Sequence, residues 1–117
     1  MICVIDDDIS IRRSFGSLFK AAELEYCSYA SVDEFLNTYA SERENVLILD
    51  VQMPGMNGCE LLKKLALQGI KLPVIIVTAF DDSETRDCAK KYGVIAFMRK
   101  PVDGEALIDL IKYSINV

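Results

Sequence analysis

Short apolar runs alternate with stretches of helical periodicity along the sequence, and this alternation constrains the fold more than any other feature. Five runs have the length of strands and are rich in Val, Ile and aromatic side chains; they cover residues 1–5, 24–30, 46–49, 73–77 and 94–98. Each run is followed by apolar residues spaced as on one face of a helix. Five strand–helix units predict an α/β fold, in which right-handed crossovers place helices on both faces of a parallel sheet. The last three runs lack polar alternation and are expected to be buried on both faces.

Capping side chains mark the starts of several predicted helices. Ser31, followed by Glu34 three residues later, forms a capping-box pattern before the apolar stripe that starts at Val32. Asp103 is expected to cap the last helix, and Asp8 is expected to cap or open the first one.

The chain has the length and composition of one globular domain. Its 117 residues, of which 51% are apolar, predict a single domain over residues 1–117 with no output domain in this chain. The net charge of −5 argues against binding nucleic acid or an anionic membrane through bulk charge. No apolar run approaches the roughly 20 residues needed to cross a bilayer, and no leader sequence precedes the first strand. We therefore expect a cytoplasmic protein.

The four cysteines do not form a metal-binding or redox motif. None belongs to a C-x-x-C pair, and the chain has no histidine to complete a mixed zinc site. Cys3 and Cys27 fall in predicted strands, whereas Cys59 and Cys88 fall in predicted helices. Structural disulfides are rare in the cytoplasm, so we expect all four residues to be reduced and to serve in packing.

Polar side chains follow the predicted strands at the edge where a doubly wound sheet holds its functional crevice. In chain order they are Asp6, Asp7, Asp8, Asp50, Thr78 and Lys100. Asp50 follows four branched apolar residues, a position where a charge is costly unless it is paired, hydrated or bound to a cation. These residues at the strand ends predict an acidic site at the carboxyl edge of the sheet.

Clustered carboxylates need a compensating positive charge. At about 5 Å and an effective dielectric constant of about 20, each pair repels by on the order of 3 kcal/mol. Mg²⁺ offsets such repulsion, since it takes oxygen ligands and is held by one or two carboxylates and waters. With the positive charge of Lys100 and the hydroxyl of Thr78 nearby, Asp50 is placed to act as the nucleophile in phosphoryl transfer.

The chain resembles the receiver domain of two-component response regulators over essentially its full length. Four segments carry the resemblance in order and spacing: VIDDD, LILDVQMPGMNG, VIIVTAF and AFMRKP. The resemblance implies a flavodoxin-like fold with five helices and a five-stranded parallel sheet of order 2-1-3-4-5. It also implies a phosphoacceptor signalling domain rather than an enzyme, catalysing only its own phosphorylation and slow self-dephosphorylation.

The resemblance further implies specific roles for the acidic residues. A partner histidine kinase, or a phosphotransfer protein of a phosphorelay, passes a phosphoryl group to Asp50. Mg²⁺ is bound by Asp7, Asp50 and the backbone carbonyl of Gln52, while Asp6 acts largely through water. The kinase would meet the first helix, near Ile9, Ile11, Arg12 and Ser14.

Three further residues are expected to respond to the phosphoryl group. The resemblance implies that Lys100 and Thr78 contact that group, and that Phe97 turns inward when Thr78 moves. It also implies a cis bond between Lys100 and Pro101. The face formed by the fourth helix, fifth strand and fifth helix then changes shape, and through this face the family dimerises or signals to an output domain. Apolar Phe80 is predicted to slow self-dephosphorylation.

Plainer interpretations and other classes of protein stay open from the sequence alone. Phe97 has the pattern of a core residue, and Lys100 that of a surface lysine.

A Mg²⁺-dependent phosphatase of the haloacid-dehalogenase type also uses an aspartate at a strand end, but it needs a second aspartate where this chain has Gln52. In an FMN-binding module, the three carboxylates would repel the phosphate of FMN. A phosphorylation-independent docking domain would not need the Asp, Thr and Lys set.

Overall fold

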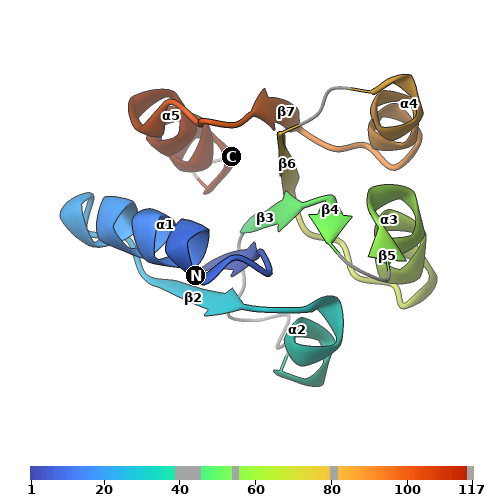
Figure 1. Ribbon diagram of the computed structural model, residues 1–117, viewed down its shortest axis with the longest axis horizontal. Helices are drawn as coiled ribbons and strands as arrows, with labels where there is room; N and C mark the ends of the chain where they lie inside the picture. Colours follow the sequence, from blue (N-terminus) through green and yellow to red (C-terminus); the bar gives the residue numbers. More distant parts are fainter. Residues whose placement is uncertain (39–45, 54–55, 80–81, 116–117) are drawn as a thin grey trace.

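Five parallel strands form the centre of the molecule, with helices on both sides of the sheet (Figure 1). The computed structural model describes residues 1–38, 46–53, 56–79 and 82–115. The strands of the sheet are β1 (Ile2–Ile5), β2 (Tyr26–Tyr29), β3 (Val46–Asp50), β6 (Val74–Thr78) and β7 (Ala96–Arg99). Their spatial order is β2-β1-β3-β6-β7, which confirms the doubly wound sheet predicted as 2-1-3-4-5.

Five helices follow the five strands of the sheet, one after each strand along the chain. They are α1 (Ile9–Ala21), α2 (Val32–Thr38), α3 (Gly58–Leu67), α4 (Ser83–Lys91) and α5 (Gly104–Ile115). Figure 1 shows α1 and α5 on one face of the sheet and α2, α3 and α4 on the other. Each face has its own apolar core, because Phe19 and Leu107 pack on the first side and Phe35 and Leu61 on the second.

The predicted helix caps are present. Asp8 and Asp103 each accept a backbone N–H from the first turn of α1 and α5, at 2.8 and 3.1 Å. The Ser31 hydroxyl accepts the Glu34 N–H at 3.1 Å, and the Glu34 carboxylate accepts the N–H of Ala30 at 3.0 Å. The capping box therefore reaches one residue further back than its usual form.

The prediction that 46–49, 73–77 and 94–98 are all buried on both faces is partly wrong. Strands β3 and β6 are buried throughout, as is β1. In β7 the residues Ala96, Phe97 and Met98 are half-buried and Arg99 is exposed. The physical reason is that β7 lies at the edge of the sheet, with a neighbouring strand on one side alone.

A short antiparallel hairpin lies between β3 and α3. It consists of β4 (Gln52–Met53) and β5 (Met56–Asn57), with Gln52 paired to Asn57. The sequence pattern does not predict this hairpin, since strands of two residues leave no periodicity to detect.

The expectation that all four cysteines are reduced is wrong for two of them. Cys59 and Cys88 form a disulfide between α3 and α4, with Cα atoms 5.5 Å apart. Cys3 and Cys27 are outside the disulfide and reduced, as expected, with their sulfur atoms 3.6 Å apart. The disulfide partners are 29 residues apart in sequence and become neighbours through the packing of α3 on α4.

The dimensions of the molecule fit those expected for a domain of this length. The radius of gyration of the Cα atoms is 13.0 Å. Within the described ranges, no helix combines the length and the apolar composition needed to cross a membrane.

Candidate functional site

The polar residues identified in the sequence gather at the carboxyl edge of the sheet. Asp50 and Thr78 are the last residues of β3 and β6, while Asp6 and Lys100 directly follow β1 and β7. These four strands are consecutive neighbours in the sheet, so their ends meet along one rim. The chain order reverses between β1 and β3, the position at which doubly wound sheets hold their ligands.

Asp6, Asp7 and Asp50 form an acidic triad at this rim. One carboxylate oxygen from each lies within 4.8 Å of the others. Asp6 and Asp50 are buried, with 1% and 4% of their surface exposed, whereas Asp7 is exposed. The predicted convergence of these three side chains is confirmed.

Hydrogen bonds fix the position of Asp6. Its Oδ1 accepts the N–H of Asp8 at 2.9 Å, and its Oδ2 accepts Lys100 Nζ at 2.9 Å. Its own N–H donates to the carbonyl of Tyr29 at 3.1 Å, and its carbonyl accepts Arg12 Nη1 at 2.6 Å. Both carboxylate oxygens of Asp6 are thus occupied by protein donors, which limits direct coordination of a cation by this residue.

Lys100 joins the two buried carboxylates. Its Nζ lies 2.9 Å from Asp6 Oδ2 and 3.5 Å from Asp50 Oδ2. Burial by itself would lower the pKa of the Lys100 ammonium, but the hydrogen bond that it donates to Asp6 and the negative charges of Asp50 and Asp6 outweigh burial and raise the pKa. Lys100 is therefore a fixed positive charge beside Asp50, as predicted, and its bond to Pro101 is cis, as the family resemblance implies.

The donor set of the triad suits a hard divalent cation. Three carboxylates converge, and Lys100 balances one of their negative charges. The Arg12 guanidinium bonds to the backbone carbonyl of Asp6 rather than to its carboxylate. Closely spaced oxygen ligands with excess negative charge are what Mg²⁺ prefers. The backbone of Gln52 lies in β4, two residues after Asp50, and its predicted role as a ligand stays a prediction.

Thr78 and Phe97 lie on the same face of the sheet, on neighbouring strands. Phe97 is paired with Ile76, and Thr78 is two residues beyond Ile76, so alternation along the strand points both side chains to the side covered by α4. Thr78 is fully buried, and Phe97 is half-buried with the Arg86 guanidinium 4.8 Å from its ring centroid. The switch role of this pair stays a prediction, and Phe80 lies outside the described residues.

Arg12 and Arg86 are contacts of the site that the sequence patterns did not identify. Arg12 was assigned to a surface for the kinase, yet it also bonds to Asp6 from the first turn of α1. Arg86 reaches Phe97 from α4. For Arg12 a signal was present, because a long side chain in the first turn of α1 points back toward the end of β1. For Arg86 the sequence held no such signal, because its contact with Phe97 depends on how α4 packs.

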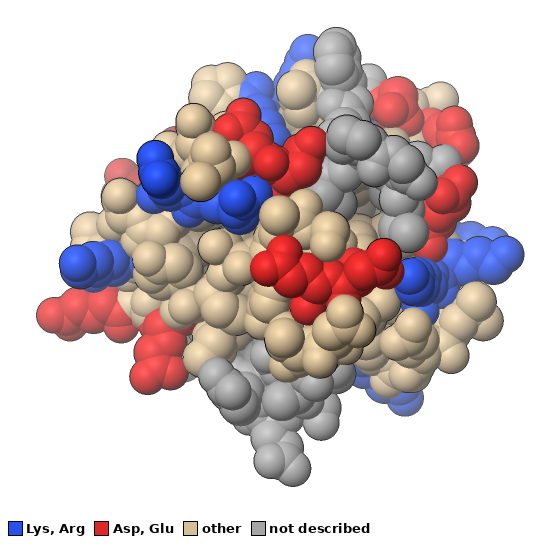
Figure 2. Space-filling view, turned by 60° about the horizontal axis from the view of Figure 1, so that its bottom comes forward, with Lys and Arg blue, Asp and Glu red and all other residues tan. Residues whose placement is uncertain are grey.

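The surface in Figure 2 carries acidic side chains in several separate patches, with basic side chains mostly toward its edges. This distribution agrees with the net charge of −5. The face shown has no broad basic surface of the kind that binds nucleic acid through its phosphates.

The fold and the acidic rim define the chain as a receiver domain. The sequence matches the family "Response regulator receiver domain" over residues 2–112, and the chain belongs to that family. The family is a phosphoacceptor signalling domain of two-component systems and not a classical enzyme. This assignment favours the receiver interpretation over the phosphatase of the haloacid-dehalogenase type.

Individual relatives show the same relationship. The chain is 34% identical to the transcriptional regulatory protein FixJ of Azorhizobium caulinodans over 113 residues, which are 97% of this chain and 54% of FixJ. It superposes on the response regulator StyR with a TM-score of 0.89 and 33% identity, covering 98% of this chain and 58% of that one. A CheY-like receiver domain protein from Methanospirillum hungatei JF-1 gives a TM-score of 0.86 at 28% identity, covering 98% and 92%. The chain thus spans about half the length of FixJ.

Proposed function

We propose that Asp50 accepts a phosphoryl group from a partner histidine kinase or phosphotransfer protein, and that this event switches the α4–β7–α5 face. The observation that carries the proposal is the buried Asp50 carboxylate, set 3.5 Å from Lys100 and inside the acidic triad. A buried carboxylate between a cation site and a fixed ammonium is placed for attack on phosphorus. We further propose that residues 1–117 act as one receiver unit in the cytoplasm.

In the proposed reaction, a carboxylate oxygen of Asp50 attacks the phosphorus of the donor, and the bond from phosphorus to the donor's histidine nitrogen breaks. Lys100 neutralises a phosphoryl oxygen from the side of β7, and the Thr78 hydroxyl donates to another. Asp7, Asp50 and the Gln52 carbonyl would hold Mg²⁺, which when bound would supply positive charge to the remaining oxygen. Asp6 keeps Lys100 in position by accepting its 2.9 Å hydrogen bond, and it would meet a bound cation largely through water.

The proposed switch follows from the shared face of Thr78 and Phe97. When Thr78 moves toward the phosphoryl group, it vacates space beside α4, and the Phe97 ring turns into that space. The α4–β7–α5 face then changes shape, and we propose this face for dimerisation or for contact with an output partner.

A hollow beside the acidic rim supports the proposed docking of the kinase. It has a volume of about 350 Å³ and lies between α1 and the segment 100–102, with Ile11, Ser14 and Pro101 among its lining residues. Lys100 belongs both to this hollow and to the rim, so a partner seated here would be next to Asp50.

Incubation with Mg²⁺ and acetyl phosphate tests the proposed function. Intact-mass analysis should show the addition of one phosphoryl group to the wild-type protein, no addition to Asp50→Asn, and much less addition without Mg²⁺. Asp8→Asn is the matched control, because Asp8 caps α1 through Ser10 and is not part of the triad; it should be phosphorylated normally. Phosphorylation of Asp50→Asn at the wild-type level would contradict the proposal.

A further inference from the structure

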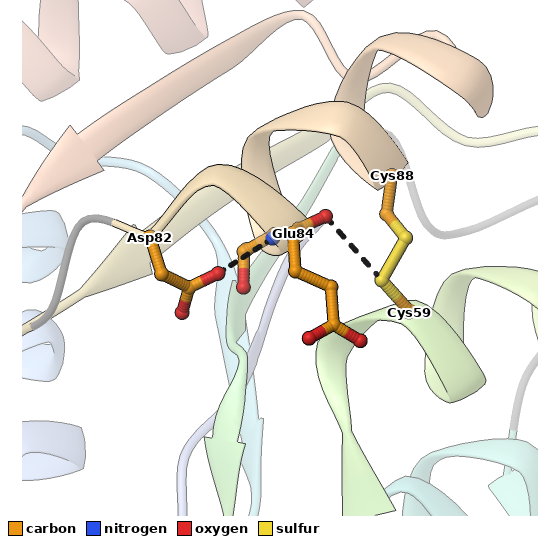
Figure 3. The surroundings of a disulfide bond; sticks show 5 residues. Cys59, Asp82, Glu84 and Cys88 are labelled. Carbon is orange, nitrogen blue, oxygen red and sulfur yellow. Dashed lines mark hydrogen bonds between the residues drawn. A yellow bond between two sulfur atoms is a disulfide. The ribbon is translucent and has the colours of Figure 1, made fainter.

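The Cys59–Cys88 disulfide joins helix α3 to helix α4. Along the chain, α3 follows β3, the strand of the proposed phosphoacceptor, and α4 follows β6, the strand that ends at Thr78. Cys59 is the second residue of α3, the helix that comes after β3 and its hairpin, and Cys88 lies in α4, the helix that comes after β6. Figure 3 shows the bond bridging the space between these helices. Both cysteines are partly exposed, so a solvent-borne reagent has a route to the sulfur atoms.

Apolar contacts hold α4 only weakly to the rest of the molecule. Ala89 is its one buried residue in the described chain, and Thr85 and Cys88 are half-buried. By comparison, α1 buries two phenylalanine rings and α5 buries Leu107 and Ile111. A helix with such small contacts is expected to open at low free-energy cost unless another bond holds it, and the disulfide is such a bond.

The position of α4 is linked to the proposed switch. The helix starts at Ser83, five residues after Thr78, and its N-cap Asp82 accepts the Thr85 N–H at 2.7 Å. From the same helix, Arg86 lies 4.8 Å from the Phe97 ring centroid. A bond that fixes α4 on α3 therefore also restricts the residues around Phe97.

We infer that the Cys59–Cys88 pair is a redox-controlled tether of α4. In the disulfide form the tether holds α4 on α3 and reduces the change that phosphorylation produces in the α4–β7–α5 face. In the dithiol form α4 is free to shift. The effect on phosphorylation rests on the proposed function, whereas the effect on α4 mobility does not. In a reducing compartment such as the cytoplasm, a disulfide of this kind is expected to be transient and regulatory.

The redox step uses a dithiol protein or small dithiol as the reductant. A thiolate of the reductant attacks one sulfur of the pair, forming a mixed disulfide and releasing the other cysteine as a thiolate that takes up a proton. The second thiol of the reductant then breaks the mixed disulfide, releases the second cysteine and leaves the reductant oxidised. Two electrons pass from the reductant to the pair, and the reverse reaction restores the tether.

The surroundings of Cys59 accommodate the reduced state as well. Its Sγ lies 3.7 Å from the carbonyl oxygen of Glu84 in the first turn of α4 (Figure 3). In the disulfide this sulfur carries no proton, but after reduction the thiol can donate a weak hydrogen bond to that carbonyl. Reduction thus replaces a covalent link by a weak polar contact.

Hydrogen exchange of residues 83–91, measured by mass spectrometry with and without dithiothreitol, tests the inference. Without any phosphodonor, reduction should make exchange in α4 about tenfold faster. The Cys59→Ser/Cys88→Ser variant should match the reduced wild type in both conditions. The control variant Cys3→Ala/Cys27→Ala, which removes the two cysteines outside the disulfide, should keep the redox response. Equal exchange of α4 in oxidised and reduced wild type would overturn the tether.

Two further measurements complete the test. Alkylation before and after reduction should show that Cys59 and Cys88 become reactive only after reduction; alkylation of both in protein purified without reductant would overturn the inference. After acetyl phosphate and Mg²⁺, the additional exchange in α4 should be larger in reduced than in oxidised protein. Absence of phosphorylation in both redox states would contradict the proposed function but not the tether. The tether is tested separately, by the hydrogen exchange of α4 measured without a phosphodonor.

Discussion

At the scale of single residues, Lys100 shows how one contact serves both stability and chemistry. Its ammonium bonds to the buried Asp6 carboxylate at 2.9 Å and lies 3.5 Å from Asp50. The same charge that reduces carboxylate repulsion in the resting protein would neutralise a phosphoryl oxygen in the proposed reaction. The side chain of Asp8, which adjoins the triad in sequence, caps α1, while its backbone N–H bonds to Asp6.

Lys100→Met should destabilise the protein at pH 8 by about 1.5–3 kcal/mol, the usual contribution of a hydrogen bond to a charged group. Because the pKa of Lys100 is raised in the folded state, its contribution is complete below the unfolded-state value of about 10.4 and disappears as the pH rises through the folded-state value. Urea unfolding at pH 8 and pH 11 should therefore show a smaller difference between variant and wild type at the higher pH.

The control for this measurement is Lys90→Met, an exposed lysine of α4. It should cost little at either pH. Tyr29, whose pKa is raised to about 12 by burial and by the hydrogen bond from Cys27, also destabilises the wild type at alkaline pH, but it does so equally in the variants and cancels from the comparison. A difference between Lys100→Met and wild type that stays constant with pH would contradict the role assigned to the Lys100 charge.

At the scale of secondary-structure elements, α4 differs from the other helices in how it is attached. Its one buried residue is Ala89, and its attachments include the disulfide to α3, the contact of Cys59 Sγ with the Glu84 carbonyl and the Arg86 contact with β7. These attachments connect α4 to the elements on either side of it. A helix held in this way can change position without disrupting the apolar core, which suits the proposed switching face.

Arg86→Ala should alter the environment of the Phe97 ring while lowering the free energy of unfolding by only about 0.5–1 kcal/mol, the usual size of an exposed cation–π contact. NMR of the Phe97 ring protons would detect the change in shift and in ring averaging. Lys90→Ala, on the same helix and exposed, is the control and should leave these signals in place. Unchanged Phe97 signals in Arg86→Ala would show that Arg86 does not position the ring.

At the scale of the whole molecule, stability combines two apolar cores with one covalent link. The disulfide closes a loop with a sequence separation of 29, for which loop-closure entropy predicts about 3–4 kcal/mol. A domain of this size has a total stability of about 5–15 kcal/mol. The reduced protein is therefore expected to remain folded, as a reversible tether requires.

Reduction should lower the melting temperature by about 10–15 °C, given the entropy of unfolding of a domain of this length. Calorimetry with and without dithiothreitol measures this shift. Cys59→Ser/Cys88→Ser should melt at the lower temperature in both conditions, while Cys3→Ala/Cys27→Ala should retain the shift. A melting temperature independent of reductant in the wild type would contradict the stabilising role of the bond.

The sequence by itself determined the strand and helix pattern, the helix caps and the acidic rim. Periodicity, caps and strand ends depend on neighbours within a few residues, so they can be read locally, and the sheet order followed from the family resemblance. The tertiary structure alone decided the contacts between distant residues: Lys100 on Asp6, 94 positions away, Arg86 on Phe97, and the Cys59–Cys88 bond. It also decided that β7 is a half-buried edge strand. The physical reason is that these features depend on how whole elements pack, and no short stretch of sequence records that packing.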